Sequence, residues 1–370
     1  MNAPSRLTLF LSGDVMTGRG VDQILPRSCP PRLYEPFVTS AIDYVEMAER
    51  KNGPIPRPVD YGYIWGAGLD VLAERRPHAR IVNLETSITT STDAEPKGIN
   101  YRMHPGNVPV LAAGGVDCCV LANNHVLDWG RGGLLETLDV LARSGIRTAG
   151  AGANLETARA PAVIDAGDLG RILVFAFGAT DSGIPRRWAA VGEQPGVHLL
   201  PDYSDTTVDR IARAVDEAKQ PGDIAVASIH WGPNWGYDVP SPHRHFAHAL
   251  VDRARIDVVH GHSSHHAKAI EVYQGRPILY GCSDLLNDYE GIRGQEEFRA
   301  NLVLMYFCTM DAGTGELARL TMTPMEIRNF RLTHPVMADR VWLRDTLDRE
   351  CRRFGHGVRL EDDALVLDRS

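Results

Sequence analysis

The sequence predicts an α/β fold in which two packed β-sheets carry helices on their outer faces. Short apolar segments of strand length alternate with segments of helical spacing through the first part of the chain, and strands then follow one another directly. The chain has 370 residues, of which 44% are hydrophobic and 23% are charged. These values are typical of a folded globular protein with a large core.

Six segments are expected to form buried strands. Each is short, rich in Val, Ile, Leu, Phe or Cys, and bounded by Gly, Asp or Asn, as strands covered on both faces are. The six segments are residues 7–12, 80–84, 117–122, 171–177, 223–229 and 257–260.

Helices and hairpins fill the intervals between and after these strands. Residues 133–144 place leucines at helical spacing and end before Gly145. Ser241-Pro242 is typical of the start of a helix, which we expect to reach about Arg253. Two pairs of consecutive strands follow, at residues 269–273 with 277–280 and at residues 302–307 with 316–325.

Two segments stand outside this pattern. Residues 25–77 carry many prolines and aromatic side chains, so we expect a long irregular insertion that acts as a lid. The tail from about Ala338 is expected to form a charged helix and then a hairpin. The sequence therefore predicts a main domain over residues 1–337 and a peripheral C-terminal extension over residues 338–370.

Charge and hydropathy exclude several classes of protein. The net charge of −8 leaves no basic excess for a nucleic acid partner. No run approaches the about 18 apolar residues that span a bilayer, so we expect no membrane segment. The short polar start lacks a signal-peptide layout, which favours a cytoplasmic protein. The six cysteines show no metal-binding spacing and are expected to be buried free thiols.

Metal-binding side chains follow five of the predicted strands, where open α/β sheets bind their ligands. Each motif alone fits a helix cap, a turn or a core histidine. Together they supply carboxylate, amide and imidazole donors, a set that suits a divalent metal, and the absence of cysteine favours a catalytic site. The motifs are Gly13-Asp14, Asn83-Leu84-Glu85, Asn123-Asn124-His125, His230-Trp231-Gly232 and the histidine-rich run from His260 to His266.

The series GDVM, NLE, NNH, HWG and GHSSH resembles the calcineurin-like metallophosphoesterase superfamily. More closely, it is similar to the CapA family, which is named for poly-γ-glutamate capsule synthesis. The similarity covers roughly residues 7 to 325. The resemblance implies a four-layer α/β/β/α sandwich and one or two divalent ions, without distinguishing Mn, Fe, Zn, Mg or Ca.

The resemblance also implies a role for each matching residue. Asp14 and His265 would hold the first metal, Glu85 would bridge both metals, and Asn124, His230 and His262 would hold the second. His125 would stay unligated and protonate the leaving group or stabilise the transition state. For Asp128, orienting His125 or a ligand and a plain turn or helix-start role stay equally open.

The sequence departs from the superfamily pattern in three places. Met16 stands where the first strand usually carries a histidine ligand, and the bridging residue Glu85 is one methylene longer than the usual aspartate. The last motif is His-x-x-His rather than His-x-His. Met16 is a poor ligand for a hard metal, so the number of bound ions stays open.

Several other residues have two interpretations each. Arg19, Lys97, Tyr101 and Arg102 can bind an anionic substrate or form solvated surface. Trp231, with Trp235 and Tyr237, can wall a cleft, although a core role is favoured. A surface or packing role is favoured for His243, His245 and His248, and a turn role for Ser283 and Asp284.

Three functions follow from these observations. The first is a metal-dependent hydrolase that uses an activated water on a phosphate ester or on an anionic, poly-γ-glutamate-like amide polymer. The second is a metal-dependent peptide-modifying enzyme, such as an epimerase, that uses the same site. The third is a non-catalytic protein of capsule or polymer assembly. The expected partner is an anionic small molecule, polymer or peptide, and the oligomeric state stays open.

Overall fold

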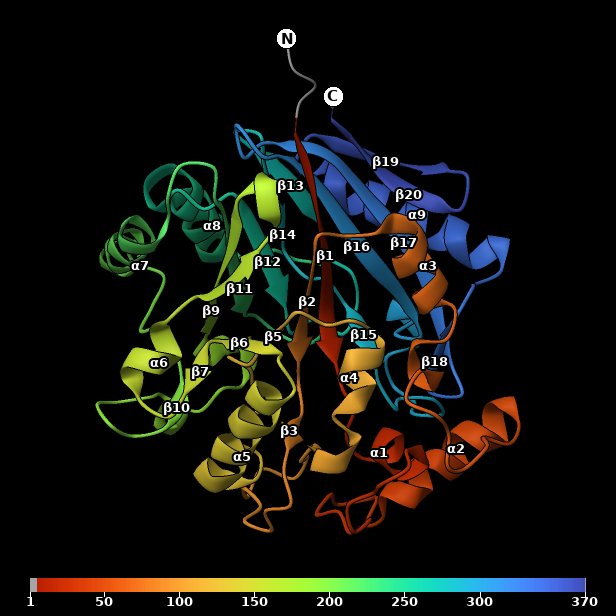
Figure 1. The fold of residues 1–370 in the computed structure, drawn as a ribbon. Helices are drawn as coiled ribbons and strands as arrows, with labels where there is room; N and C mark the ends of the chain where they lie inside the picture. Colours follow the sequence, from red (N-terminus) through yellow and green to blue (C-terminus); the bar gives the residue numbers. More distant parts are fainter. Residues whose placement is uncertain (1–4, 370) are drawn as a thin grey trace.

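The computed structural model describes residues 5–369 and contains two large β-sheets that pack face to face (Figure 1). The first sheet has the strand order β19-β20-β17-β16-β1-β2-β5-β6, with β15 beside β1 and β18 beside β17. Its strands are β1 (Arg6–Val15), β2 (Ala79–Leu84), β5 (Cys118–Val120), β6 (Arg147–Ala149), β15 (Asp284–Leu286), β16 (Leu302–Asp311), β17 (Leu317–Arg328), β18 (Arg331–Thr333), β19 (His356–Glu361) and β20 (Ala364–Arg369).

The second sheet has the order β13-β14-β12-β11-β9-β8, and its central strands β9, β11, β12 and β14 run parallel. Its strands are β8 (Ala162–Asp165), β9 (Arg171–Gly178), β11 (Ile224–His230), β12 (Val258–His262), β13 (Ile270–Tyr273) and β14 (Arg276–Leu279). Two short strand pairs lie apart from the large sheets: β3 (Ser87–Ile88) with β4 (Arg102–Met103), and β7 (Ala151–Gly152) with β10 (Gly196–Val197).

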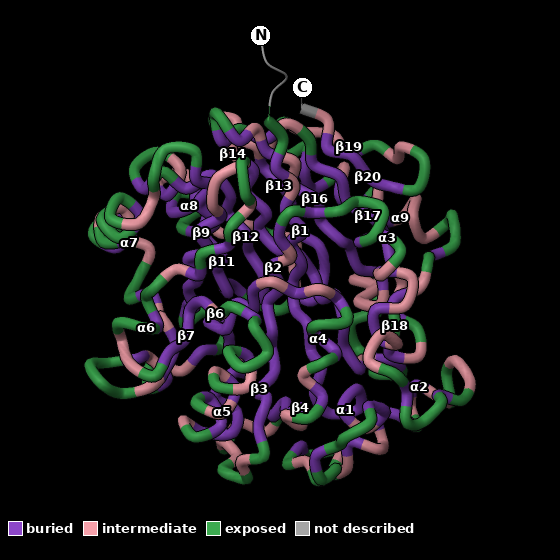
Figure 2. The backbone as a smooth tube through the Cα atoms, in the orientation of Figure 1, coloured by how far each residue is buried: buried purple, intermediate pink, exposed green. Residues whose placement is uncertain are grey.

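Helices cover the outer face of each sheet, which confirms the four-layer α/β/β/α sandwich. Along β1, Leu9 and Leu11 face the second sheet, whereas Phe10 faces the helices, as the period of two in a strand requires. Figure 2 shows that the central strands are buried, whereas α7 is exposed on its outer side. The helices are α1 (Gly20–Ile24), α2 (Ala41–Asn52), α3 (Gly68–Arg75), α4 (Pro109–Ala113), α5 (Gly130–Arg143), α6 (Leu155–Arg159), α7 (Asp205–Ala218), α8 (Ser241–Ala254) and α9 (Met337–Arg352).

Three apolar cores hold these layers together. One lies between the two sheets, one lies under α1 to α5, and the third lies under α7 and α8. In the third core, Val208 and Ile211 of α7 and Phe246 of α8 pack on β9 and β11. Because parallel strands share one direction, β1, β2 and β5 end at one edge, toward the lower half of Figure 1.

The segment 25–77 is not the irregular insertion that its prolines indicated. It contains α2 and α3, and Val71 and Leu72 of α3 pack in the core under the first sheet. Helix α3 therefore belongs to the crossover that joins the parallel strands β1 and β2. The prolines are confined to the loops around these helices, so composition over the whole segment concealed the short helical patterns.

The C-terminal residues complete the edge of the first sheet. Helix α9 places Leu343 and Leu347 in the core between the sheets, and β20 pairs with β17 through Thr321 opposite Val366. All six cysteines lie in the described part of the chain and are buried free thiols, as expected. Within residues 5–369, the helices are too short or too polar to span a bilayer.

Candidate metal centre

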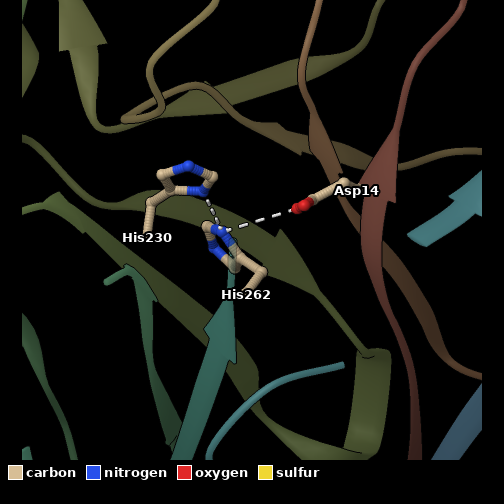
Figure 3. A group of neighbouring side chains, drawn as sticks. All are labelled: Asp14, His230 and His262. Carbon is tan, nitrogen blue, oxygen red and sulfur yellow. Dashed lines mark hydrogen bonds and ion pairs between the residues drawn. The ribbon is translucent and has the colours of Figure 1, made fainter. Parts of the chain in front are cut away.

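Three of the expected ligands meet where the two sheets come together (Figure 3). Asp14 lies near the end of β1, and His230 and His262 are the last residues of β11 and β12. The Nδ1 atoms of His230 and His262 are 2.9 Å apart, and His262 Nδ1 lies 4.0 Å from Asp14 Oδ1. All three side chains are buried, so their ligand atoms face one another rather than bulk water.

A second group shares Asp14 and adds His265 and Asp284. His265 Nδ1 lies 2.8 Å from Asp284 Oδ1 and 3.9 Å from Asp14 Oδ2. The sequence favoured a turn role for Asp284, but the structure places it on β15, opposite Asp14 in a parallel pairing. No local motif marks this pairing, because β15 joins β1 through contacts between residues 270 positions apart.

Gly13 allows this close approach. A Cβ atom at this position would lie 1.6 Å from the carbonyl oxygen of Ser283, so a larger residue would force the two segments apart. The Asp14 amide donates to the same carbonyl at 3.0 Å. The Gly-Asp pair therefore brings residues 283 and 284 to the metal centre.

An amide relay across the strand ends orients Asp14. Asn123 donates to Asn83 at 3.0 Å, and Asn83 donates to Asp14 Oδ1 at 2.7 Å. Asp14 Oδ2 and Glu85 Oε2 are buried and have no hydrogen-bond partner among the described residues. Buried carboxylate oxygens without partners are costly, so this donor set fits a divalent cation.

The remaining expected ligands lie beside the first group. Glu85 Oε1 is 3.9 Å from His230 Nε2, and Asn124 Oδ1 is 3.1 Å from the same nitrogen. The structure thus brings all six expected ligand residues into one cluster, in which Asn124 is half-buried and the other five are buried. Asp14, rather than Glu85, is the residue common to both groups.

Burial and mutual repulsion set the protonation of this cluster. Burial, followed by the charge of Asp284, raises the pKa of Asp14 to about 7, and burial and Asp14 raise the pKa of Glu85 well above its usual value. Burial lowers the pKa of His230 and His262 far below 6.5. Burial also lowers the pKa of His265, but the charge and hydrogen bond of Asp284 outweigh burial, so the pKa of His265 is raised.

Metal affinity is expected to increase as the pH rises through about 7. A metal binds the carboxylate form of Asp14, whose raised pKa of about 7 leaves much of it protonated below neutrality. Titration calorimetry with Mn²⁺ at pH 6, 7 and 8, in buffers of different ionisation enthalpy, measures the affinity and the protons released. An affinity that is constant over this range, with no proton release, would contradict the raised pKa.

A chain of hydrogen bonds beneath the site fixes the tautomer of His262. His260 Nε2 lies 2.9 Å from the carbonyl oxygen of Ser12, which only accepts, so Nε2 carries the proton. Burial lowers the pKa of His260 to about 4, so its Nδ1 is an acceptor for the Ser228 hydroxyl at 3.1 Å. The Ser228 oxygen then accepts from His262 Nε2 at 2.9 Å, which leaves the lone pair of Nδ1 toward Asp14.

Removing the Ser228 hydroxyl is expected to weaken metal binding about 10–100-fold, the usual effect of losing an outer partner of a metal ligand. Ser228→Ala removes the acceptor that holds the proton on His262 Nε2. Ser264→Ala is a matched control, because its hydroxyl donates only to the His266 carbonyl. Equal metal affinities of the two variants would show that this chain does not set the tautomer.

His125 lies at the rim of the cluster, and Asp128 holds its ring at Nδ1. Its Nδ1 is 2.6 Å from Asp128 Oδ2, and its Nε2 points toward Glu85 Oε1 at 3.7 Å. Lys97 donates to Asp128 Oδ1 at 2.7 Å and also contacts the Asn124 carbonyl. Burial lowers the pKa of His125 to about 4, with Asp128 acting in the opposite direction. This geometry supports an orienting role for Asp128.

Tyr101 and Tyr289 form a wall on the same side of the site. The Tyr101 ring lies 4.5 Å from the His125 ring, and its hydroxyl is 3.1 Å from that of Tyr289. Arg19 sits behind this wall with its side chain 2% exposed, and it donates to Asp288, Glu35 and Tyr44. Arg19 therefore holds the wall in place, and its guanidinium is not free to bind an anionic substrate.

The side chains of two other expected substrate residues pack against neighbouring aromatic rings. Arg102 stacks on Trp129 at 3.8 Å and donates to the Ser91 carbonyl at 2.6 Å. Trp231 stacks on His243 at 4.7 Å within the core under α7 and α8, the role that the sequence favoured. Trp235 instead lies 5.3 Å from the His265 ring, at the edge of the site.

Comparison with known proteins identifies the family. Residues 8–289 match the family model described as bacterial capsule synthesis protein PGA_cap. The chain is 47% identical to a probable polyglutamine synthesis accessory protein of Mycobacterium tuberculosis, over 98% of this chain and 96% of that protein. It is 27% identical to the PGA biosynthesis protein CapA of Bacillus subtilis, over 98% of this chain and 82% of that protein.

A solved structure of a phosphatase from Mycoplasma pneumoniae aligns over 88% of this chain and 95% of that chain, with a TM-score of 0.46 and 10% identity. The family match spans the segments that carry Asp14, Glu85, Asn124, His230 and His265. The chain therefore belongs to the PGA_cap family of bacterial capsule synthesis proteins.

Proposed function

We propose that this protein is a metal-dependent hydrolase that acts on a phosphate ester or on an anionic, polyglutamate-like amide polymer. The observation that carries the proposal is the meeting of two ligand groups at Asp14, with buried carboxylate oxygens that lack partners. The names of its relatives, which refer to polyglutamine synthesis and PGA biosynthesis, favour a polymer of glutamate or glutamine.

A divalent metal at this site supplies a Lewis acid that polarises a phosphoryl or carbonyl group and acidifies a water molecule. The chain itself supplies the ligands, and His125 supplies a proton-transfer group at Nε2. Asp128 fixes the ring and stabilises its protonated form, while Lys97 balances the charge of Asp128. Tyr101 packs against the His125 ring and limits its movement.

Space for part of a substrate lies next to His265. A cavity of about 280 Å³ is lined by Trp235, Asn287 and Tyr289, together with several charged side chains. The rings of Trp235 and Tyr289 lie 5.3 Å and 5.4 Å from the His265 ring. Three cationic side chains, Lys51, Arg293 and Arg299, favour an anionic ligand. Arg299 also pairs with Asp339, and Glu290 and Glu296 in the same wall reduce the net charge. This cavity supports a substrate that is larger than a simple phosphate ester.

The test is an activity screen with the metal-loaded protein. Purified protein is stripped with a chelator, reloaded with Mn²⁺, and assayed with bis-p-nitrophenyl phosphate, p-nitrophenyl phosphate and poly-γ-glutamate. We expect turnover of at least one substrate that disappears on chelation and returns with Mn²⁺. No hydrolysis by the loaded protein would contradict the proposal, and solvent deuterium at a peptide Cα would replace it with the peptide-modifying alternative.

A further inference from the structure

We propose that Asp284 is a metal ligand that replaces the missing first-strand histidine. With Asp284, the position formed by Asp14, His265 and Asp284 becomes an oxygen-rich site for a hard cation such as Mn²⁺. The inference rests on the metal site of the proposed function, but it does not depend on which reaction occurs there.

Met16 cannot fill the ligand position that the sequence leaves open. Its side chain is buried, and the Tyr289 hydroxyl donates to its sulfur at 3.5 Å. A thioether is a soft ligand and binds hard divalent cations poorly. Met16 therefore contributes to the tyrosine wall, and Asp14 is left as the ligand that the first strand supplies to this side of the centre.

Asp284 reaches the same place from the neighbouring strand. The parallel pairing of β1 with β15 sets Asp284 directly beside Asp14, and the Asp284 side chain is completely buried. Its Oδ1 lies 2.8 Å from His265 Nδ1, and its Oδ2 accepts from Asn287 at 2.7 Å. A carboxylate oriented in this way by a neighbouring amide is typical of a metal ligand with its outer partner.

Asp14 supplies an independent indication that a cation belongs here. Its Oδ2 is buried without a hydrogen-bond partner and lies on the side of His265, 3.9 Å from Nδ1. Asp14 and Asp284 are also two buried carboxylates side by side, and no arginine or lysine is bonded to either of them within residues 5–369. A divalent ion between them would balance both charges, which the single imidazole of His265 does only in part.

The two positions then differ in chemistry. The first has two carboxylates, from Asp14 and Asp284, and one imidazole, whereas the second has the shared Asp14 and two imidazoles, from His230 and His262. Carboxylate-rich sites suit Mg²⁺, Mn²⁺ and Ca²⁺, and imidazole-rich sites suit Zn²⁺ and other borderline metals. The structure thus assigns the harder cation to the Asp284 side.

Counting bound Mn²⁺ by the electron paramagnetic resonance signal of the free ion tests this assignment. We expect the wild-type protein to bind two ions and Asp284→Asn to bind one of them at least about 10-fold more weakly, since the replacement removes a ligand charge without changing its size. Asp257→Asn is the matched control, because it neutralises a buried aspartate that pairs with Lys219 at the opposite end of β12. Unchanged affinity for both ions in Asp284→Asn would overturn the proposal.

A measurement on the unmodified protein gives a second test that does not depend on how well the variant folds. When Zn²⁺ is added to the Mn²⁺-loaded protein, we expect one Mn²⁺ to be released well before the other, and release of both together would contradict unequal positions. A wild type that binds no Mn²⁺ overturns both this inference and the proposed function. A protein that binds two ions but hydrolyses nothing overturns only the proposed function.

Discussion

Replacing Asp14 with asparagine is expected to empty both metal positions at once. Asp14 is the residue shared by the two ligand groups, and its Oδ2 is the buried oxygen that lacks a partner. Loss of this carboxylate should weaken binding of each ion by more than about 100-fold, the upper end for residues that only support a ligand. Metal content by mass spectrometry after dialysis measures the result, and activity should fall with it.

Two single variants serve as comparisons for Asp14→Asn. His230→Ala removes a donor from one group, and His265→Ala removes a donor from the other. Each is expected to lose one ion and keep the other, whereas Asp14→Asn loses both. If Asp14→Asn loses only one ion, then Asp14 does not belong to both positions and the two groups do not share a ligand.

Replacing His125 with alanine is expected to lower kcat about 10²–10⁴-fold without changing metal content. The loss is that of a positioned proton-transfer group, because His125 Nε2 points to the site while Asp128 holds Nδ1 at 2.6 Å. The matched control is His243→Ala, which removes another buried histidine bonded to an aspartate, Asp181, at 2.7 Å.

The two variants, His125→Ala and His243→Ala, are expected to change different properties. His243 stacks on Trp231 in the core under α7 and α8, so its removal should lower thermal stability while kcat changes little. A loss of bound metal in His125→Ala would instead assign His125 to the ligands. Equal kcat values for His125→Ala and the wild type would remove His125 from the reaction.

The sequence predicted the fold well where the pattern was local. The buried strands were recognised because both of their faces are covered and their apolar runs are continuous, as in β9 and β11. Their ends were less accurate: β1 continues to Val15, three residues beyond the predicted end, since Asp14 is polar but is still part of the ladder. Helix α7 was missed although the sequence marks it: Ser204 is a helix cap, and Val208, Ile211 and Val215 recur at helical spacing on its buried face.

The sequence predicted those residues of the site that lie in motifs at the ends of strands. Asp14 lies next to the end of a recognisable strand, and His230 and His262 are the last residues of two others. Parallel strands end at a common edge of their sheet, which brings such residues together. Asp284 was assigned to a turn because its role depends on the pairing of β15 with β1, which leaves no local pattern. Arg19 was misjudged for a similar reason: its acidic partners Asp288 and Glu35 come from distant segments, so the sequence did not show that its charge is already balanced.

The position of β1 between β2 and β16 has a consequence for the order in which the chain matures during synthesis. The ribosome makes β1 first, but its antiparallel partner β16 begins only at Leu302, and β15 only at Asp284. Asp14 is therefore held in its final place partly by contacts with a strand that is made 270 residues later, as expected of a topology rich in distant pairings. A nascent chain that has exposed every histidine of the centre still lacks β15 and β16 beside β1, so we expect tight metal uptake only after these two strands have been made.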